Sequence, residues 1–228
     1  MDIGRSFTYV AEDQDWIKKV LLGGAITLIP IVGQVFALGY MIKTLKNVVA
    51  GEETPLPEIG DFGGKLVEGL KGGVIALVYG LPLILFGACS QTGSLAPLVA
   101  ENVDPDIVET LTSVSIGVSA CCGCLLLLYV ILMGLVLPFA LGKYAETGQM
   151  GAAFKLSDIF NMLKSSIGPA LIVLLVGGLT VFVAELVGLI ACGIGLFFAL
   201  FYAQLVMAFL YGSLYRRARG LTLQPEQP

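Results

Sequence analysis

Five stretches of this sequence of 228 residues contain no Asp, Glu, Lys or Arg. They cover residues 20–42, 72–100, 110–142, 165–184 and 186–215. A helix needs about 20 mostly apolar residues to cross the hydrocarbon of a bilayer, and each stretch reaches that length. Only 13% of the residues are charged, against roughly 25% in soluble domains, so too few remain for the surface helices of a soluble core. We therefore predict an all-α fold, a polytopic helical transmembrane bundle.

The apolar stretches and the loops between them predict one transmembrane domain over residues 1–228. Trp16 and the apolar residues spaced around it indicate a helix at the headgroup level before the first stretch. We expect this interfacial helix over 5–19, membrane segments over about 20–45, 70–89, 114–141, 166–187 and 192–215, an outer loop over 90–113, cytoplasmic loops with short interfacial helices over 46–69 and 143–165, and a cytoplasmic tail over 216–228.

Loop charge predicts which side of the membrane each loop faces, because Lys and Arg are enriched in cytoplasmic loops. Ten basic residues fall within 43–71, 143–165 and the tail, whereas 90–113 carries four acids and no base. We therefore expect a multi-pass protein of the cell inner (cytoplasmic) membrane with its C-terminus in the cytoplasm.

Pro30 and Gly33 predict a helix break inside the first apolar segment, because proline removes a backbone hydrogen bond and clashes with the preceding turn. A segment that crosses fully gives five spans and leaves three basic residues outside. A segment that dips in and returns gives four spans and keeps all thirteen basic residues inside. We favour this re-entrant hairpin, and both alternatives stay open here.

A short pattern occurs twice in the chain. Ala37-Leu38-Gly39-Tyr40 is followed by a loop, Asp61-Phe62 and a helix, and Ala140-Leu141-Gly142-Lys143-Tyr144 is followed by a loop, Asp158-Ile159-Phe160 and a helix. The repetition suits a duplicated helix–loop–helix unit, as in many membrane folds. It equally suits two unrelated amphipathic loops.

Small residues repeat at about four-residue intervals on two helices, a spacing that lets helix backbones approach closely in lipid. These seams are Ser115, Ser119 and Gly123 on the third segment, and Ala191, Gly195, Ala199 and Ala203 on the fifth. Packing within the chain is the favoured interpretation. Contact with other membrane proteins, or self-association, is the alternative.

The five cysteines all fall in the predicted outer half of the bundle: Cys89, Cys121, Cys122, Cys124 and Cys192. We interpret them first as small apolar residues. A disulfide or thiol cluster is the alternative, and an oxidising exterior would favour it.

Three polar residues fall within the membrane segments and are candidates for a functional role: Gln34, Glu185 and Gln204. A transporter usually brings several such groups together at mid-depth beside broken helices. Three dispersed residues are a weak signal of this kind.

Composition argues against several classes of function. The chain has no His, which removes the commonest metal ligand and the usual general base near neutral pH. A formal charge of −4 argues against nucleic-acid binding, which requires a basic face. No nucleotide-binding loop and no nucleophile–base pair is visible. We expect no enzymatic activity, no catalytic residues, no metal and no cofactor.

Specific residues of the N-terminal third resemble a known family. The pattern comprises Asp15-Trp16-Ile17-Lys18-Lys19, Ile29-Pro30-Ile31-Val32-Gly33, Gly39-Tyr40, Gly51-Glu52, Leu56-Pro57 and Gly69-Leu70. It resembles the prokaryotic membrane proteins grouped as domain of unknown function 4013, over most of the chain. The resemblance implies a multi-helix membrane protein of bacteria or archaea, and it implies no activity.

Two functions follow as hypotheses. The first is a non-catalytic accessory or scaffold subunit that lies in the lipid bilayer and packs against other membrane proteins. The alternative is a small transporter or channel that uses the Pro30–Gly33 break. A continuous polar path past Gln34, Gln204 and Glu185 would favour transport, and a dry interior with an exposed seam would favour docking.

Overall fold

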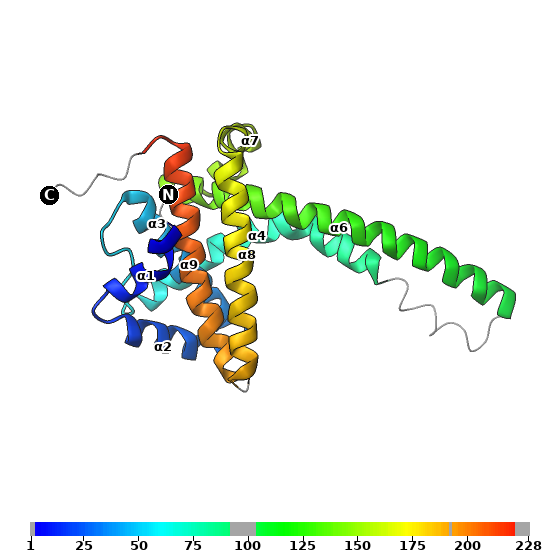
Figure 1. Cartoon of the computed structure of the whole chain (residues 1–228), viewed down its shortest axis with the longest axis horizontal. Helices are drawn as coiled ribbons and strands as arrows, with labels where there is room; N and C mark the ends of the chain where they lie inside the picture. The colour runs from blue at the N-terminus through cyan, green and yellow to red at the C-terminus, as the bar shows by residue number, and fades with distance from the viewer. Residues whose placement is uncertain (1–2, 92–103, 192, 222–228) are drawn as a thin grey trace. The chain divides into compact units, whose positions relative to one another are not determined.

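The computed structural model describes residues 3–91, 104–191 and 193–221, and this part of the chain is helical without any strand (Figure 1). The elements are α1 (Ile3–Glu12), α2 (Trp16–Thr27), α3 (Val32–Ala50), α4 (Phe62–Ser90), α6 (Pro105–Thr147), the 3-10 helix η2 (Met150–Phe154), α7 (Leu156–Ser165), α8 (Ile167–Ile190) and α9 (Ile194–Ala218).

Four helices are long and apolar enough to cross a membrane: Phe62–Ser90, Asp106–Thr147, Ile167–Ile190 and Ile194–Ala218. The predicted all-α fold with four to five spans is therefore confirmed, and the chain is a multi-pass membrane protein. Within the described residues, α2 and α3 are not among these four helices.

The chain forms two compact units. Unit 1 comprises residues 1–76 and 135–228, and unit 2 comprises residues 77–134. Helices α4 and α6 each contribute one part to unit 1 and the other part to unit 2.

Helix α9 is the centre of unit 1. It packs against α1, α2, α3, α7 and α8, and its side chains are largely buried from Phe201 onwards (Figure 1). Small residues allow the close contacts, because a Cβ on Gly212 would meet the side chain of Val48 on α3. On α8, the face away from α9 exposes leucines such as Leu175 and Leu179, as a lipid-facing surface does.

The first apolar segment consists of two helices, because α2 ends at Thr27 and α3 begins at Val32. Pro30 lies in the connection, and Ile31 has a φ of 64°, a conformation that β-branched residues rarely adopt. Gly33 lies inside the first turn of α3, where an added Cβ would lie 2.8 Å from the Cα of Thr27. The interruption is therefore at residues 28–31, and Gly33 provides the close contact between the two helices.

The N-terminal stretch differs from the single interfacial helix expected over 5–19. Helix α1 ends at Glu12 and α2 starts at Trp16, because the Asp13 carboxylate accepts a hydrogen bond of 2.9 Å from the backbone N–H of Asp15 and turns the chain. The second oxygen of Asp13 binds the Lys19 ammonium at 2.6 Å, with both side chains only 11–12% exposed. This ion pair fixes the angle between the two helices.

Helices α4 and α6 are longer than the membrane segments expected over 70–89 and 114–141. The Asp61 carboxylate accepts a 2.9 Å hydrogen bond from the N–H of Gly64, so α4 starts at Phe62 and includes what the sequence predicted as a short interfacial helix. Helix α6 starts within the expected outer loop. Residues 92–103 of that loop lie outside the described part of the chain.

Candidate functional site

Glu68 is the hub of a polar network in unit 1. Its Oε2 atom accepts hydrogen bonds from the Tyr144 hydroxyl at 2.7 Å and from the Lys46 ammonium at 2.6 Å, and Lys71 lies 3.5 Å from its other oxygen. These residues come from α4, α6 and α3. A half-buried carboxylate with three partners holds the ends of three helices together.

Two ion pairs of the same kind flank this hub. Lys43, near the end of α3, binds Asp61 just before α4, and Lys143, near the end of α6, binds Asp158 on α7. The hydrogen bond from Lys43, with a second from the N–H of Gly64, lowers the pKa of the Asp61 carboxyl below its usual range. Lys143 lowers the pKa of Asp158 in the same way. Each pair ties the end of one long helix to the start of the next.

Lys65 is buried beside the hub. Its ammonium donates hydrogen bonds to the carbonyl oxygens of Glu58 and Asp61, and it lies over the rings of Phe36 and Tyr40 at 5.8 and 5.5 Å from their centroids. Aromatic faces and carbonyl oxygens both stabilise a cation. The loop before α4 is therefore held against α3.

The C-terminal turn of α9 is tied into the same end of unit 1. Arg216 donates hydrogen bonds of 3.2 Å to the carbonyl oxygens of Val48 and Val49, which end α3. The Tyr215 hydroxyl donates a 2.5 Å hydrogen bond to Glu146 at the end of α6. A cation at a helix C-terminus satisfies carbonyls that have no partner within the helix.

The network has a structural role at this end of unit 1, because its carboxylates are already bound by cations or hydroxyls. Within the described residues there is no group of three or more His, Cys, Asp or Glu that could hold a metal ion. The side chains of the network hold the ends of neighbouring helices together.

The three polar residues predicted within the membrane do not hydrogen-bond to one another in the described part of the chain. The Gln34 amide donates to the Thr27 carbonyl at 3.4 Å, across the α2–α3 turn. Glu185 is exposed on α8. The Oε1 atom of Gln204, on α9, is buried and has no hydrogen-bond partner among the described residues.

The seam predicted on the fifth segment lies against α8. Ala203 is buried and Ala199 is half-buried on α9, and a Cβ on Gly195 would meet the Cβ of Ala191 in the turn. On α8, a Cβ on Gly188 would overlap the Cα of Leu196, so the two helices approach closely there. The sequence analysis missed three buried small residues of α8 that repeat every seven residues, Ala170, Gly177 and Ala184, of which Gly177 lies against Met207 of α9.

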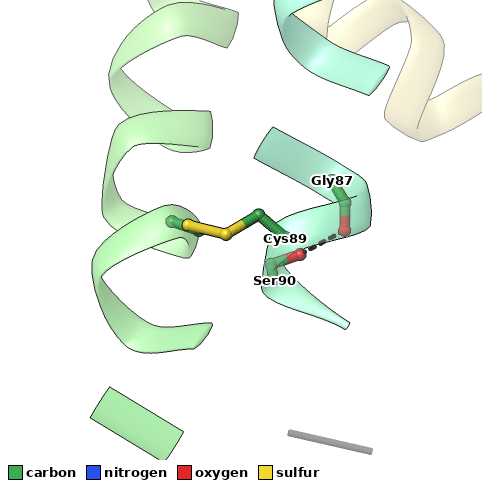
Figure 2. The surroundings of a disulfide bond; sticks show 4 residues. Gly87, Cys89 and Ser90 are labelled. Carbon is green, nitrogen blue, oxygen red and sulfur yellow. Dashed lines mark hydrogen bonds between the residues drawn. A yellow bond between two sulfur atoms is a disulfide. The ribbon is translucent and has the colours of Figure 1, made fainter. Parts of the chain in front are cut away.

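Cysteines join the two helices of unit 2 (Figure 2). Cys89 at the end of α4 forms a disulfide with Cys122 on α6, with a Cα–Cα distance of 6.0 Å. Cys121 and Cys124 are exposed free thiols. Cys192 lies outside the described residues. The disulfide alternative thus applies to one pair of the five cysteines.

The seam predicted on the third segment lies next to this disulfide. Gly123 and Ser119 are half-buried, and Gly123 directly follows Cys122. The Ser115 hydroxyl donates a 2.9 Å hydrogen bond to the Thr112 carbonyl of its own helix. Elsewhere in unit 2, the Tyr129 hydroxyl of α6 donates a 2.8 Å hydrogen bond to the Tyr79 carbonyl of α4.

Glycines of the long helices differ in what surrounds them. In unit 1, a Cβ on Gly39 of α3 would overlap the carbonyl oxygen of Lys65, and one on Gly69 of α4 would overlap that of Val35. In unit 2, a Cβ on Gly80 or Gly87 of α4 would meet no described residue within 4 Å, and the same holds for Gly178 on α8 of unit 1. The seven-residue spacing of Gly80 and Gly87 puts both on one face of α4.

The polar network was the main feature that the sequence analysis did not identify. Its lysines were used only to predict sidedness, and Glu68 and Tyr144 were not singled out. The repeated Ala-Leu-Gly pattern was a partial signal, because each copy is followed by one lysine–aspartate pair, Lys43–Asp61 and Lys143–Asp158, although the two lysines do not align.

One comparison with known proteins gives a match. A family described as protein of unknown function (DUF4013) matches residues 22–193. No curated protein and no solved structure matches the chain.

Proposed function

We propose that this chain, which belongs to the DUF4013 family of proteins of unknown function, is a non-catalytic accessory or scaffold subunit. In this proposal it packs against another membrane protein within the cytoplasmic membrane of a bacterium or archaeon. The description of the family assigns no function, so the proposal rests on the geometry of the two units, each taken by itself.

The open glycine face of α4 carries the proposal. Among the described residues, nothing lies within 4 Å of a Cβ added to Gly80 or Gly87, whereas Gly39, Gly69 and Gly188 of unit 1 each lie against a neighbouring backbone. Close backbone contact at small residues is a main source of helix association in lipid. The α4 face at Gly80 and Gly87 is therefore available to a helix of another protein.

The interior of unit 1 supports a packing role over a transport role. Its buried cluster is aromatic and aliphatic and includes Tyr9, Phe36, Phe201 and Phe209. The Tyr9 and Phe209 rings stack with centroids 4.7 Å apart. A path for a polar solute would need water or polar groups where these side chains pack.

The orientation is part of the proposal. Four spans with a re-entrant α2–α3 hairpin would place both termini and all thirteen basic residues in the cytoplasm. Epitope tags at the N- and C-terminus test this. Both tags should be protected from protease in intact spheroplasts. Cleavage of the N-terminal tag would show that the N-terminus lies outside and that the chain has five spans.

Native mass spectrometry of the full chain after gentle detergent extraction tests the accessory role. The wild-type chain should be recovered in a complex of defined stoichiometry with one other membrane polypeptide. The double substitution Gly80→Ile and Gly87→Ile should release it as a monomer. Gly178→Ile on α8 is the matched control, because Gly178 is exposed and also has no neighbour within 4 Å.

A second candidate function is a small transporter or channel that uses the break at Pro30. The buried Oε1 atom of Gln204, which has no partner in the described part of the chain, favours it, since buried polar atoms are normally hydrogen-bonded. Conductance recordings from planar bilayers that contain the purified chain test this function. A current through the wild-type chain that is smaller in the Gln204→Leu variant would support a transport function in place of the accessory role.

A further inference from the structure

The basic residues of the chain differ in how their charges are neutralised. Eight of the thirteen form ion pairs with acids, and Lys65 and Arg216 donate to backbone carbonyl oxygens. All thirteen lie in the described part of the chain, and there only Lys155, Lys164 and Arg217 have neither an ion pair nor a side-chain hydrogen bond. All three are exposed, so their charges are available to an external partner.

The three cations gather at one end of unit 1. Lys155 precedes α7, Lys164 lies in its last turn, and Arg217 lies in the last turn of α9, which contacts α7. Only Ser166 separates α7 from α8, so α7 lies at the end of a membrane span. Because α8 and α9 pack side by side and are joined by a short turn, the start of α8 and the end of α9 share that end (Figure 1).

Helix α7 presents an apolar face that unit 1 does not cover. Ile159 and Leu163 are buried against the bundle, whereas Leu156 and Phe160 are 49% and 38% exposed. Leu156, Phe160 and Lys164 follow one another at four-residue spacing and therefore lie on one face of the helix. An exposed apolar face that continues into a lysine suits the boundary between acyl chains and headgroups.

Two described acids at this end of unit 1 already have partners. Asp158 on α7 is bound by Lys143, and Glu146 at the end of α6 is bound by Arg219 and the Tyr215 hydroxyl. Lys155 is close enough to Asp158 to contribute to the lowering of its pKa, although Lys143 contributes most. The remaining positive charge is therefore directed away from the protein.

We propose that Leu156, Phe160, Lys155, Lys164 and Arg217, together the α7 surface, bind anionic phospholipid of the adjacent leaflet. The apolar side chains enter the acyl region, and the three cations bind the phosphate groups of the lipid. Each basic residue near an anionic leaflet strengthens binding by about fivefold. The inference needs the chain to span the membrane, and it does not rest on the accessory role.

Lipid retention measured by native mass spectrometry tests this site. The full chain is released from bilayers of phosphatidylcholine mixed with phosphatidylglycerol, and the ratio of the two retained lipids is compared with that of the bilayer. The wild-type chain should be enriched in phosphatidylglycerol. The triple substitution Lys155→Gln, Lys164→Gln and Arg217→Gln should lower that enrichment by about fivefold per residue, towards none.

The control variant changes the net charge by the same amount at exposed cations that have acidic partners: Arg5→Gln, Lys18→Gln and Lys71→Gln. It should keep the enrichment, and Lys155→Arg with Lys164→Arg should keep it as well. Equal losses in the two triple variants would overturn the site in favour of a general charge effect. No enrichment in the wild-type chain would also overturn it.

A soluble anion distinguishes a leaflet from a plain phosphate site. Glycerol phosphate lacks acyl chains, so an excess of it should leave the retained phosphatidylglycerol in place. Displacement by glycerol phosphate would overturn the leaflet assignment. A chain that keeps its protein partner but loses its lipid preference would separate this site from the accessory role.

Discussion

The Tyr144 hydroxyl donates a 2.7 Å hydrogen bond to Oε2 of Glu68, a residue 76 positions earlier in the chain. The same oxygen accepts a hydrogen bond from Lys46. One carboxylate thus joins the ends of α3, α4 and α6, which no local signal in the sequence connects.

Removal of this hydroxyl should destabilise unit 1. Tyr144→Phe should cost about 1.5–3 kcal/mol, because the lost hydrogen bond has a charged acceptor in a half-buried place. Unfolding titrations of the full chain in mixed micelles measure the change. Tyr202→Phe is the matched control: its exposed hydroxyl donates to the neutral Phe7 carbonyl at 2.7 Å, so its loss should cost about 1 kcal/mol or less. Equal costs for the two variants would contradict a special role of Glu68.

The crossing of α3 and α4 should not tolerate a methyl group at Gly39. An added Cβ would overlap the Lys65 carbonyl oxygen, so Gly39→Ala should cost about 1–3 kcal/mol through displaced backbone. Gly178→Ala on α8 meets nothing within 4 Å and should stabilise by up to about 1 kcal/mol, because alanine is the better helix former. Thermal unfolding midpoints in one detergent compare the two, and a neutral Gly39→Ala would show that the helices do not touch there.

Acid should weaken the links at Asp61 and Asp158, because both carboxyls have lowered pKa values in the folded chain. A lowered pKa gives stability that is present above the unfolded value, near 3.9, and is lost as the pH falls through the folded value. The unfolding midpoint should therefore stay constant from neutral pH to about pH 5 and fall below about pH 4. In the double variant Asp61→Asn with Asp158→Asn, the unfolding midpoint should fall less at acid pH than in the wild-type chain. An equal fall of the unfolding midpoint in this variant would assign the pH dependence to other carboxyls.

The cysteines of unit 2 should differ in their reactivity towards alkylating agents. Without reductant, Cys121 and Cys124 should be modified, and Cys89 and Cys122 should be modified only after reduction. Peptide mass spectrometry of the denatured chain reads each site. Cys89→Ser should increase hydrogen exchange at the end of α4, whereas Cys124→Ser should not, because only the first loses a cross-link. Alkylation of Cys89 without reductant would contradict the disulfide.

The apolar spans could be predicted from the sequence, because a bilayer imposes helix length and composition directly. The turn between α8 and α9 was also readable, since glycines such as Gly193, with its φ of 79°, end helices. Helix starts were less predictable. Asp61 extends α4 by eight residues beyond the expected start at residue 70, because its side chain satisfies an N–H of the first turn.

The candidate site could be predicted only in part. Pro30 indicated the interruption between α2 and α3 through its own covalent structure. Tyr144 lies 76 residues from Glu68, and the carbonyls bound by Arg216 lie more than 160 residues from it, so only the folded chain brings these groups together. Gly39 and Gly80 look alike in the sequence, but the folded chain places the Lys65 carbonyl against Gly39 and no described residue within 4 Å of a Cβ on Gly80.

Photocrosslinking from Ile84 tests the accessory role most directly. Ile84 is 57% exposed and lies between Gly80 and Gly87 on the same face of α4. A photoreactive residue there should give one protein adduct of defined mass in native membranes, and that adduct should disappear in Gly80→Ile with Gly87→Ile. The same probe at Leu175, which is 70% exposed on α8, should label lipid alone. Lipid adducts alone from position 84, or equal protein adducts from both positions, would contradict the account.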